Sequence, residues 1–415
     1  MTADLDTFRS DAAAWLAANL TKTEHGGRRV RGLHADSTDD MDKARDIQRK
    51  LYDAGYAGIT YPKEYGGQGL SDAHERAFNE VAADYEMPDF SILGGTTYGV
   101  CLPTLLAHGS DAFKKEHLPK ILRGDELWCQ FFSEPEAGSD LAASQTRATK
   151  DGDNWVLNGA KIWSSLAHFA DYGLCLTRTN WDVPKHSGLT WFAVPTNAKG
   201  LEILPIREIN GNTGFCQEFF DDVVIPDLHR VGDVNQGWTV TQTMLAYERG
   251  AGREGPEEAG FAPLAPDLVS LARRSGRAGD PRVRQLVAEA HTNDIVQEVL
   301  QKRIEESMRM SGMNAGVAAY GKLGKGIYNP IRARIAMEIA GSASLAWKAD
   351  DTEAVTTAIR YLNGREMSIA GGTNEMQRNG ISERVLGLPR EPSFDRDKPF
   401  TEVLRGARNW TGKVG

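Results

Sequence analysis

Residues 133–140 read Ser-Glu-Pro-Glu-Ala-Gly-Ser-Asp, and residues 163–165 read Trp-Ser-Ser. The small side chains of Ala137 and Gly138 allow a backbone to approach a ligand closely, and serine hydroxyls both donate and accept hydrogen bonds. Trp163 offers a broad face against which a ring can lie. These residue types suit a site that holds a flat ring system and a phosphate. The alternative is a serine-rich turn followed by an ordinary core tryptophan.

The composition is that of a globular protein with several domains. The chain has 415 residues, of which 40% are hydrophobic and 25% are charged, so roughly two to four domains with a large core are expected. The net charge of −9 argues against general nucleic-acid binding. No apolar run approaches the ~18 residues that span a bilayer, and no secretory signal is visible after Met1. We therefore expect a cytoplasmic protein without a membrane span.

The four cysteines also favour a cytosolic setting. They are scattered and include no Cys-x-x-Cys pair, which is typical of reduced core residues; they are Cys101, Cys129, Cys175 and Cys216. We expect neither disulfides nor a metal site.

Hydrophobic periodicity divides the chain into an N-terminal α-helical domain over residues 1–127, a middle β domain over 128–232 and a C-terminal α-helical bundle over 233–415. In the first, one helical face carries Leu5, Phe8, Ala12, Trp15 and Leu16. Short β-branched or aromatic runs punctuated by Gly, Pro, Asp and Asn predict antiparallel strands in the second, at residues 154–157, 174–177, 189–194 and 223–225, with a tight turn at 151–153.

The C-terminal region shows helical spacing again after an interruption. Two sets of apolar residues each share a helical face: Val283, Leu286, Val287 and Ala290, then Val296, Val299 and Leu300. Residues 250–281 are rich in Gly, Pro and Ala, and we expect an irregular excursion there.

Five motifs in order along the chain resemble one family. They are Tyr61-Pro62-Lys63-Glu64-Tyr65-Gly66-Gly67-Gln68-Gly69, the Ser133–Asp140 block, Asn158-Gly159-Ala160-Lys161-Ile162-Trp163, Phe219-Phe220-Asp221-Asp222-Val223-Val224-Ile225-Pro226 and Gly371-Gly372-Thr373-Asn374-Glu375-Met376-Gln377-Arg378-Asn379. From about Leu5 to about Arg390 the chain resembles the acyl-CoA dehydrogenases. The resemblance implies an α+β multidomain fold, with a helical domain, an antiparallel β-barrel-like domain and a four-helix bundle.

The resemblance also implies FAD as cofactor and a role for each matching residue. Ser133 and Ser139 would hydrogen-bond the flavin and its pyrophosphate. Trp163 would pack on the isoalloxazine ring, and Ser165 would lie near its reactive nitrogen. Contacts to the adenosine half would come from Thr373 and Glu375, usually from a neighbouring part of the assembly. Glu136 stands where many members have glycine, so the backbone path there is expected to differ slightly.

The catalytic base is where the sequence departs from many relatives. They carry Glu directly before the Gly-Thr of the last motif, and this chain has Gly371 there. A minority place the glutamate in a Glu-Arg pair at the start of the C-terminal domain, which implies Glu248 as base and Arg249 as a CoA contact. Burial near the flavin would then raise the pKa of Glu248 toward ~6–7. Backbone amides of Gly371 or Gly372 would serve the thioester oxygen, and the missing side chain would leave room for a branched or ring-bearing acyl group.

The expected reaction is α,β-desaturation of an acyl-CoA thioester, in which Glu248 removes the Cα proton and the Cβ hydride passes to flavin. The resemblance implies an electron-transfer flavoprotein as electron acceptor, a role in lipid metabolism and a homo-oligomer, dimer or tetramer. The chain lacks the Arg-x-x-Phe-Gly and Gln-x-x-Gly-Gly-x-Gly motifs with which many members reach a neighbour's FAD. Bacterial members acting on bulky CoA esters are similar in this respect, and some pair two unlike chains.

Two further functions remain open. One is a flavin oxidase or monooxygenase on the same fold. The other is a flavin-incomplete subunit of a heteromeric acyl-CoA dehydrogenase, which would serve to complete a partner's site.

Overall fold

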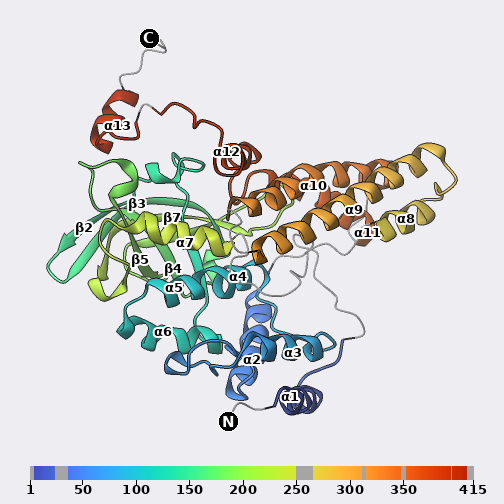
Figure 1. Cartoon of the computed structure of the whole chain (residues 1–415), viewed down its shortest axis with the longest axis horizontal. Coiled ribbons are helices and arrows are strands. Elements are labelled where there is room, and N and C mark those ends of the chain that lie inside the picture. The colour runs from blue at the N-terminus through green and yellow to red at the C-terminus, as the bar shows by residue number, and fades with distance from the viewer. Residues whose placement is uncertain are drawn as a thin grey trace.

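The computed structural model describes residues 4–23, 36–248, 265–310, 315–346, 352–393 and 395–408. Helices from the first part of the chain lie on one side of a twisted β-sheet, and a long helical bundle extends away from it (Figure 1). The last helix, α13, returns to the sheet. This arrangement confirms the predicted fold class.

The N-terminal helices begin and end at recognisable signals. The Ser37 hydroxyl accepts a hydrogen bond from the Asp40 amide at 3.2 Å at the start of α2, and Ser110 caps α6 in the same way. Gly124, with φ 80°, ends α6 in the left-handed conformation. Phe8, Ala12 and Leu16 are buried, as the spacing predicts. The helices are α1 (Leu5–Asn19), α2 (Thr38–Asp53), α3 (Asp72–Ala82), α4 (Ser91–Thr96), α5 (Leu102–His108) and α6 (Asp111–Arg123).

The middle region forms an eight-stranded sheet in the order β6-β7-β3-β2-β4-β5-β8, with β1 paired to β4. Pairing is mainly antiparallel, but β1 and β2 run parallel to β4, so the purely antiparallel prediction is wrong in this detail. The predicted turn at 151–153 joins β2 to β3, with Gly152 at φ 56°. The strands are β1 (Trp128–Phe131), β2 (Arg147–Asp151), β3 (Asn154–Ser165), β4 (Tyr172–Arg178), β5 (Leu189–Pro195), β6 (Leu201–Ile206), β7 (Phe215–Pro226) and β8 (Arg230–Val231).

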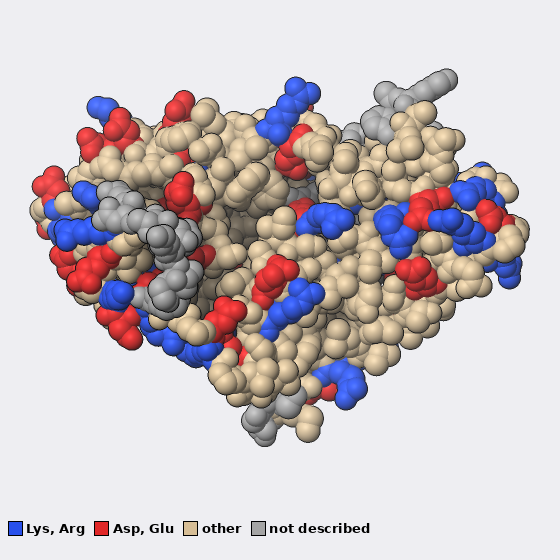
Figure 2. All heavy atoms as spheres, turned by 90° about the horizontal axis from the view of Figure 1, so that it is seen from above, with Lys and Arg blue, Asp and Glu red and all other residues tan. Residues whose placement is uncertain are grey.

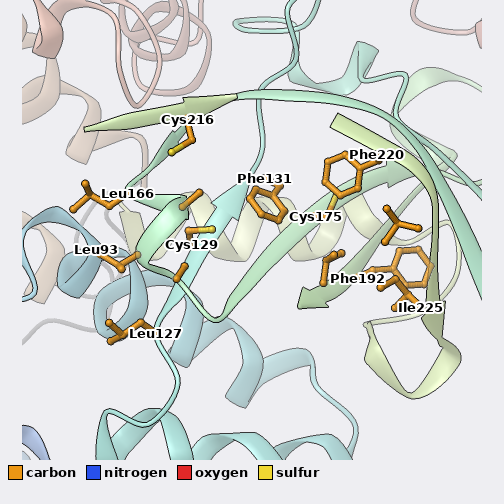
Figure 3. Packing of buried hydrophobic residues seen from close by; sticks show 14 of the residues in the cluster. Leu93, Leu127, Cys129, Phe131, Leu166, Cys175, Phe192, Cys216, Phe220 and Ile225 are labelled. Carbon is orange, nitrogen blue, oxygen red and sulfur yellow. The ribbon is translucent and has the colours of Figure 1, made fainter. Parts of the chain in front are cut away.

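The principal core lies between the sheet and the N-terminal helices. Leu93 and Leu127 meet Phe131, Phe192 and other strand residues there (Figure 3). All four cysteines are buried and free. Burial of this apolar surface stabilises the packing of the N-terminal helices against the strands that carry the site.

Helices α8 to α11 form an elongated bundle that extends away from the sheet, whereas α7 and α13 lie beside the sheet (Figure 1). Asp280 caps α9, and Pro281 occupies its first turn. The predicted irregular excursion over 250–281 is wrong over its later part, because α8 lies there; Leu268, Leu271 and Ala272 face the core of the bundle. Residues 250–264 lie outside the described part of the chain. The helices are α7 (Gly237–Glu248), α8 (Ala265–Arg274), α9 (Pro281–Arg309), α10 (Ala318–Ala340), α11 (Thr352–Asn363), α12 (Asn374–Arg384) and α13 (Phe400–Arg408).

Direct contacts connect the sheet to the helices that follow it. The Trp191 indole donates to the Gly237 carbonyl at the start of α7 at 2.9 Å, and the Asn210 amide donates to the Asn363 side chain on α11 at 3.0 Å. Seen from above, the surface is hollowed between the sheet and the bundle, and the walls are mostly uncharged (Figure 2). In the described ranges, no helix is both long and apolar enough to span a bilayer.

Candidate active site

Trp163 is presented to the surface by an irregularity in β3. The register between β3 and β7 shifts between Ile162 and Ser164, and Trp163 has φ 68°, which is rare for a bulky residue. The bulge reverses the inward–outward alternation of the strand. Trp163 is 56% exposed, and the next residue, Ser164, is buried. The Trp163 ring is therefore not a core side chain, and more than half of it is exposed.

Ser133 lies beside this strand. The Ile162 amide donates to the Ser133 carbonyl at 2.9 Å, which brings the two stretches of the predicted site together. Glu134 and Ala137 exchange backbone hydrogen bonds of 3.1 and 3.0 Å and close a tight turn, with Glu136 exposed on it. Ser139 is exposed, and a Cβ added at Gly138 would meet nothing within 4 Å. This side of the loop therefore faces open space.

A buried ion pair holds this loop to β3. The Lys161 ammonium donates to the Glu134 carboxylate at 2.8 Å and to the Phe132 carbonyl at 3.0 Å. Glu134 also accepts from the Gln145 and Thr146 amides. Burial alone would raise the pKa of Glu134, but the Lys161 charge and these hydrogen bonds hold it below its usual value.

A second acid lies on the other side of Lys161. Glu218 is the β7 partner of Lys161 and accepts from the Ser164 hydroxyl at 2.9 Å. Its other oxygen has no hydrogen-bond partner among the described residues. Burial raises the pKa of Glu218 to about 7, although Ser164 and Lys161 act in the opposite direction. The strand beneath Trp163 is therefore fixed by a polar network inside the domain.

Glu248 and Gly371 are brought together from elements far apart in the sequence. Glu248 is the last residue of α7, and Gly371 precedes α12. A Cβ built on Gly371 would lie 3.0 Å from Oε1 of Glu248 and 3.4 Å from Cε of Lys322 on α10. The side chain of Glu248 is exposed in the chain by itself, so the burial expected from sequence is not present there. Arg249 lies outside the described residues.

The Gly371–Gly372 turn is held by α12. The two glycines have φ 64° and 87°, a conformation that disfavours side chains. The Gln377 amide donates to both of their carbonyls, at 3.0 and 3.3 Å. A Cβ at Gly372 would lie 2.8 Å from the same amide nitrogen, so a side chain there would displace Gln377 as well as strain the backbone.

Thr373 and Glu375 stand at the start of α12. The Thr373 hydroxyl caps the helix by accepting from the Met376 amide at 3.2 Å. Glu375 is exposed, with its carboxylate 3.3 Å from Arg378. Its backbone hydrogen bond and the Thr373 hydroxyl keep the pKa of Glu375 below its usual value. The Glu375 side chain is therefore exposed, and that of Thr373 is partly exposed.

The predicted residues thus form two clusters, one around Trp163 and one around Glu248. Two hollows elsewhere contain none of them. One is lined by residues of the 208–214 loop together with His168, and the other lies between α8 and α9 around Val283 and His291. No group of three or more metal-binding side chains occurs in the described ranges.

Sequence reasoning missed three charged residues of these clusters. Glu134 and Lys161 belong to the quoted motifs, but a bulge cannot be anticipated there, so their pairing below Trp163 was not predicted. Lys322 lies in a glycine-rich helical stretch without any motif that points to function. Its ammonium donates to the Met367 carbonyl, close to the Gly371 turn.

Comparisons with known proteins place this geometry in a family. Residues 6–125 match the model of the acyl-CoA dehydrogenase N-terminal domain, and residues 129–223 match that of the middle domain. Acyl-CoA dehydrogenase IpdE1 of Mycobacterium tuberculosis is 36% identical over 395 residues, covering 94% of this chain and 99% of the relative. Acyl-CoA dehydrogenase FadE34 of the same organism is 36% identical, over 83% of this chain and 46% of the relative.

Solved structures agree. The Tcur3481-Tcur3483 steroid ACAD has a TM-score of 0.73 at 28% identity, covering 94% of this chain and 99% of that one. The ChsE4-ChsE5 complex from Mycobacterium tuberculosis has a TM-score of 0.68 at 27% identity, with coverage of 94% and 99%. With a relative of this identity aligned over nearly its whole length, the chain belongs to the acyl-CoA dehydrogenase family of oxidoreductases.

Proposed function

We propose that this chain catalyses the FAD-dependent α,β-desaturation of an acyl-CoA thioester, with Glu248 as the base. The observation that carries the proposal is the position of the Glu248 carboxylate, 3.0 Å from the point where Gly371 would bear a Cβ. Many relatives place their glutamate at the position of Gly371. A carboxylate therefore reaches the same region from the end of α7.

The residues around Trp163 suit FAD. The exposed indole offers a face for the flavin ring, and the hydroxyls of Ser133, Ser139 and Ser165 lie on the two neighbouring segments. Thr373, partly exposed, and Glu375, exposed, at the start of α12 would serve the adenosine half. When bound, FAD supplies the acceptor for the hydride equivalent that the substrate loses from Cβ.

Glu248 would take the Cα proton, since a carboxylate within reach of a carbon acid acts as general base. The proton would stay on the carboxyl group until solvent removes it. Bound cofactor and substrate would exclude water from Glu248 and so bury its carboxylate, which is exposed in the structure. Gly371 and Gly372 would present the backbone to the thioester oxygen, and Arg249 would contact CoA. The Lys322 ammonium, near Gly371, would add positive charge beside an enolate formed there.

A bulky, ring-bearing acyl group is the substrate class we favour. Its support is the steroid ACAD, which is similar over 94% of this chain, together with the missing side chain at Gly371. The same neighbour and the ChsE4-ChsE5 complex each pair two chains, which supports assembly with a second chain of this family as well as the homo-oligomer expected from sequence. An electron-transfer flavoprotein would receive the electrons.

No feature of the described residues favours the oxidase alternative. The likeness to the prolyl acyl carrier protein oxidase AnaB, at 20% identity, shows a shared fold and gives no support for oxidase activity. Consumption of oxygen with product formation, in the absence of another electron acceptor, would favour the oxidase.

Glu248→Gln tests the proposal. The variant should retain its yellow flavin, because Glu248 is not among the proposed FAD ligands, but acyl-CoA should no longer bleach it under anaerobic conditions. The control is Glu202→Gln on the exposed face of β6, which should bleach normally. A panel of esters from short-chain to steroid-sized should show the fastest bleaching with ring-bearing groups. Full bleaching of Glu248→Gln would remove Glu248 as base.

A further inference from the structure

The end of the described chain folds back onto the β domain. In Figure 1, α13 lies beside the sheet, away from the other C-terminal helices. The Phe400 amide donates to the Val183 carbonyl at 2.9 Å, and the Thr401 amide donates to the Trp181 carbonyl at 3.0 Å. The Thr401 hydroxyl also reaches the Asp182 carboxylate at 2.9 Å. Residues 395–403 thus form a strap, called here the C-terminal strap.

The Phe400 side chain holds the C-terminal strap in a buried pocket, called here the socket, next to Arg178 and Trp181. The side chain is 1% exposed, with the Arg178 guanidinium 3.9 Å from the ring centre and the Trp181 ring 5.8 Å away. Arg178 is itself buried and donates to the Ala142 and Ser144 carbonyls at 2.5 and 2.9 Å. A buried cation over a ring is strongly attractive. Phe400 therefore packs on the side chain that holds the 142–144 segment, immediately after the Ser139 loop.

A shared lysine connects the strap to that loop directly. The Lys185 ammonium lies 2.7 Å from the Asp140 carboxylate and 2.6 Å from the Asp395 carboxylate. Lys185 is largely buried, and Asp140 follows Ser139 in the chain. Charge-assisted hydrogen bonds of this length are among the stronger polar contacts. The strap and the predicted phosphate-binding loop are therefore held by the same cation.

We propose that the C-terminal strap is a positioning element of the cofactor site, which holds the Ser139–Asp140 loop in the conformation that receives the FAD diphosphate. The inference depends on the proposed function, in that Ser139 must contact FAD. Hydrogen bonds between Glu134 and Ala137 restrain the first half of the loop, but a side chain added at Gly138, in its second half, would meet nothing within 4 Å. Phe400 and Asp395, acting through Arg178 and Lys185, supply restraints from outside the loop, so less conformational freedom remains to be lost when FAD binds.

The experiment is a titration of apoprotein with FAD at low temperature, followed by quenching of flavin fluorescence. Deletion of residues 393–415 and the substitution Phe400→Ala should each weaken FAD binding by about tenfold or more. Phe400→Leu, which keeps an apolar side chain in the socket, should restore most of the affinity. Deletion of residues 409–415 alone, beyond α13, should leave the affinity unchanged.

Asp395→Asn provides the decisive arm, because it leaves the packing around Phe400 intact. Removal of a negative charge near a diphosphate should by electrostatics alone tighten FAD binding, so weaker binding reports lost positioning. Unchanged or tighter binding of FAD by Asp395→Asn, or unchanged binding by folded Phe400→Ala, would overturn the inference.

Ser139→Ala in the full chain separates the two proposals. Weaker FAD binding by this variant, with the strap variants unaffected, would remove the role of the strap alone. No effect of Ser139→Ala on FAD affinity would remove the assumed contact and with it the proposed cofactor site.

Discussion

At the scale of single residues, Gly371 matters for what it lacks. Its φ of 64° favours glycine, and a Cβ at this position would lie 3.0 Å from Oε1 of Glu248, closer than most van der Waals contacts. A side chain here and a carboxylate delivered from α7 would compete for the same space. Glycine at position 371 and a glutamate at position 248 therefore belong together, because the glycine leaves the space that the Glu248 carboxylate occupies.

Gly371→Ala tests this competition. The added methyl group would strain the backbone and displace Glu248, and small errors in the placement of a base slow proton transfer. We expect flavin reduction by acyl-CoA, measured anaerobically by stopped flow, to slow by about tenfold or more, with the flavin retained. Gly380→Ala on α12 is the control, because its Cβ meets nothing within 4 Å. An unchanged rate in Gly371→Ala would mean that the Glu248 carboxylate is not held beside Gly371 during catalysis.

Glu248 as the base, and its relation to Gly371, could be proposed only from the resemblance to a family. Nothing in the spacing of Glu248 and Gly371, which are more than a hundred positions apart, brings them together. The contact between the end of α7 and the turn before α12 depends on how α7 packs against the sheet and how α12 packs against α10. The amphipathic pattern of one helix does not determine which neighbour its last residue meets.

At the scale of elements, the strand pair β3–β7 combines a feature that sequence predicts with one that it does not. The predicted strand at 154–157 is part of β3, and the one at 223–225 is part of β7, with which it pairs. The bulge at Trp163 involves neither glycine nor proline, which are the usual signals for such irregularities. The alternation of inward and outward residues along a strand therefore does not predict that Trp163 faces outward and Ser164 inward.

Glu218 beneath this bulge makes stability depend on pH. Because burial raises its pKa from 4.5 to about 7, the folded state binds its proton more tightly than the unfolded chain. The resulting stabilisation is fully present below pH 4.5 and is lost as the pH rises through about 7. Between pH 5 and 8 we expect this group to lower the free energy of unfolding by about 2 kcal/mol.

Glu218→Gln should remove that dependence, since glutamine is neutral and can still accept from Ser164. Denaturant unfolding of the apoprotein at pH 5 and pH 8 measures it, with Glu202→Gln as the exposed control on β6. The difference between the two pH values should shrink by about 2 kcal/mol in Glu218→Gln alone. An equal difference in wild type and Glu218→Gln would show that Glu218 titrates as an ordinary carboxyl group.

At the scale of the whole molecule, the two sets of apolar residues that each share a helical face in α9 differ in their burial. Val283, Leu286 and Ala290 enter the core of the bundle. Farther along the same helix, Ile295, Val296 and Val299 are each about half exposed. Sequence periodicity predicts which residues share a face but cannot tell whether the same chain or another covers it.

We expect a second chain to cover the Ile295–Val296–Val299 face in the proposed assembly, since adjacent exposed aliphatic side chains are typical of interaction sites. Val299→Asp should place an unpaired charge in that contact and reduce the mass measured by light scattering toward that of a single chain. Glu298→Gln, about 100° away on the helix and ion-paired to Lys302, is the matched control and should leave the mass unchanged. If Thr373 and Glu375 serve a neighbour's FAD, Val299→Asp should also weaken FAD binding; an unaltered mass would place the subunit contact on another face of the bundle.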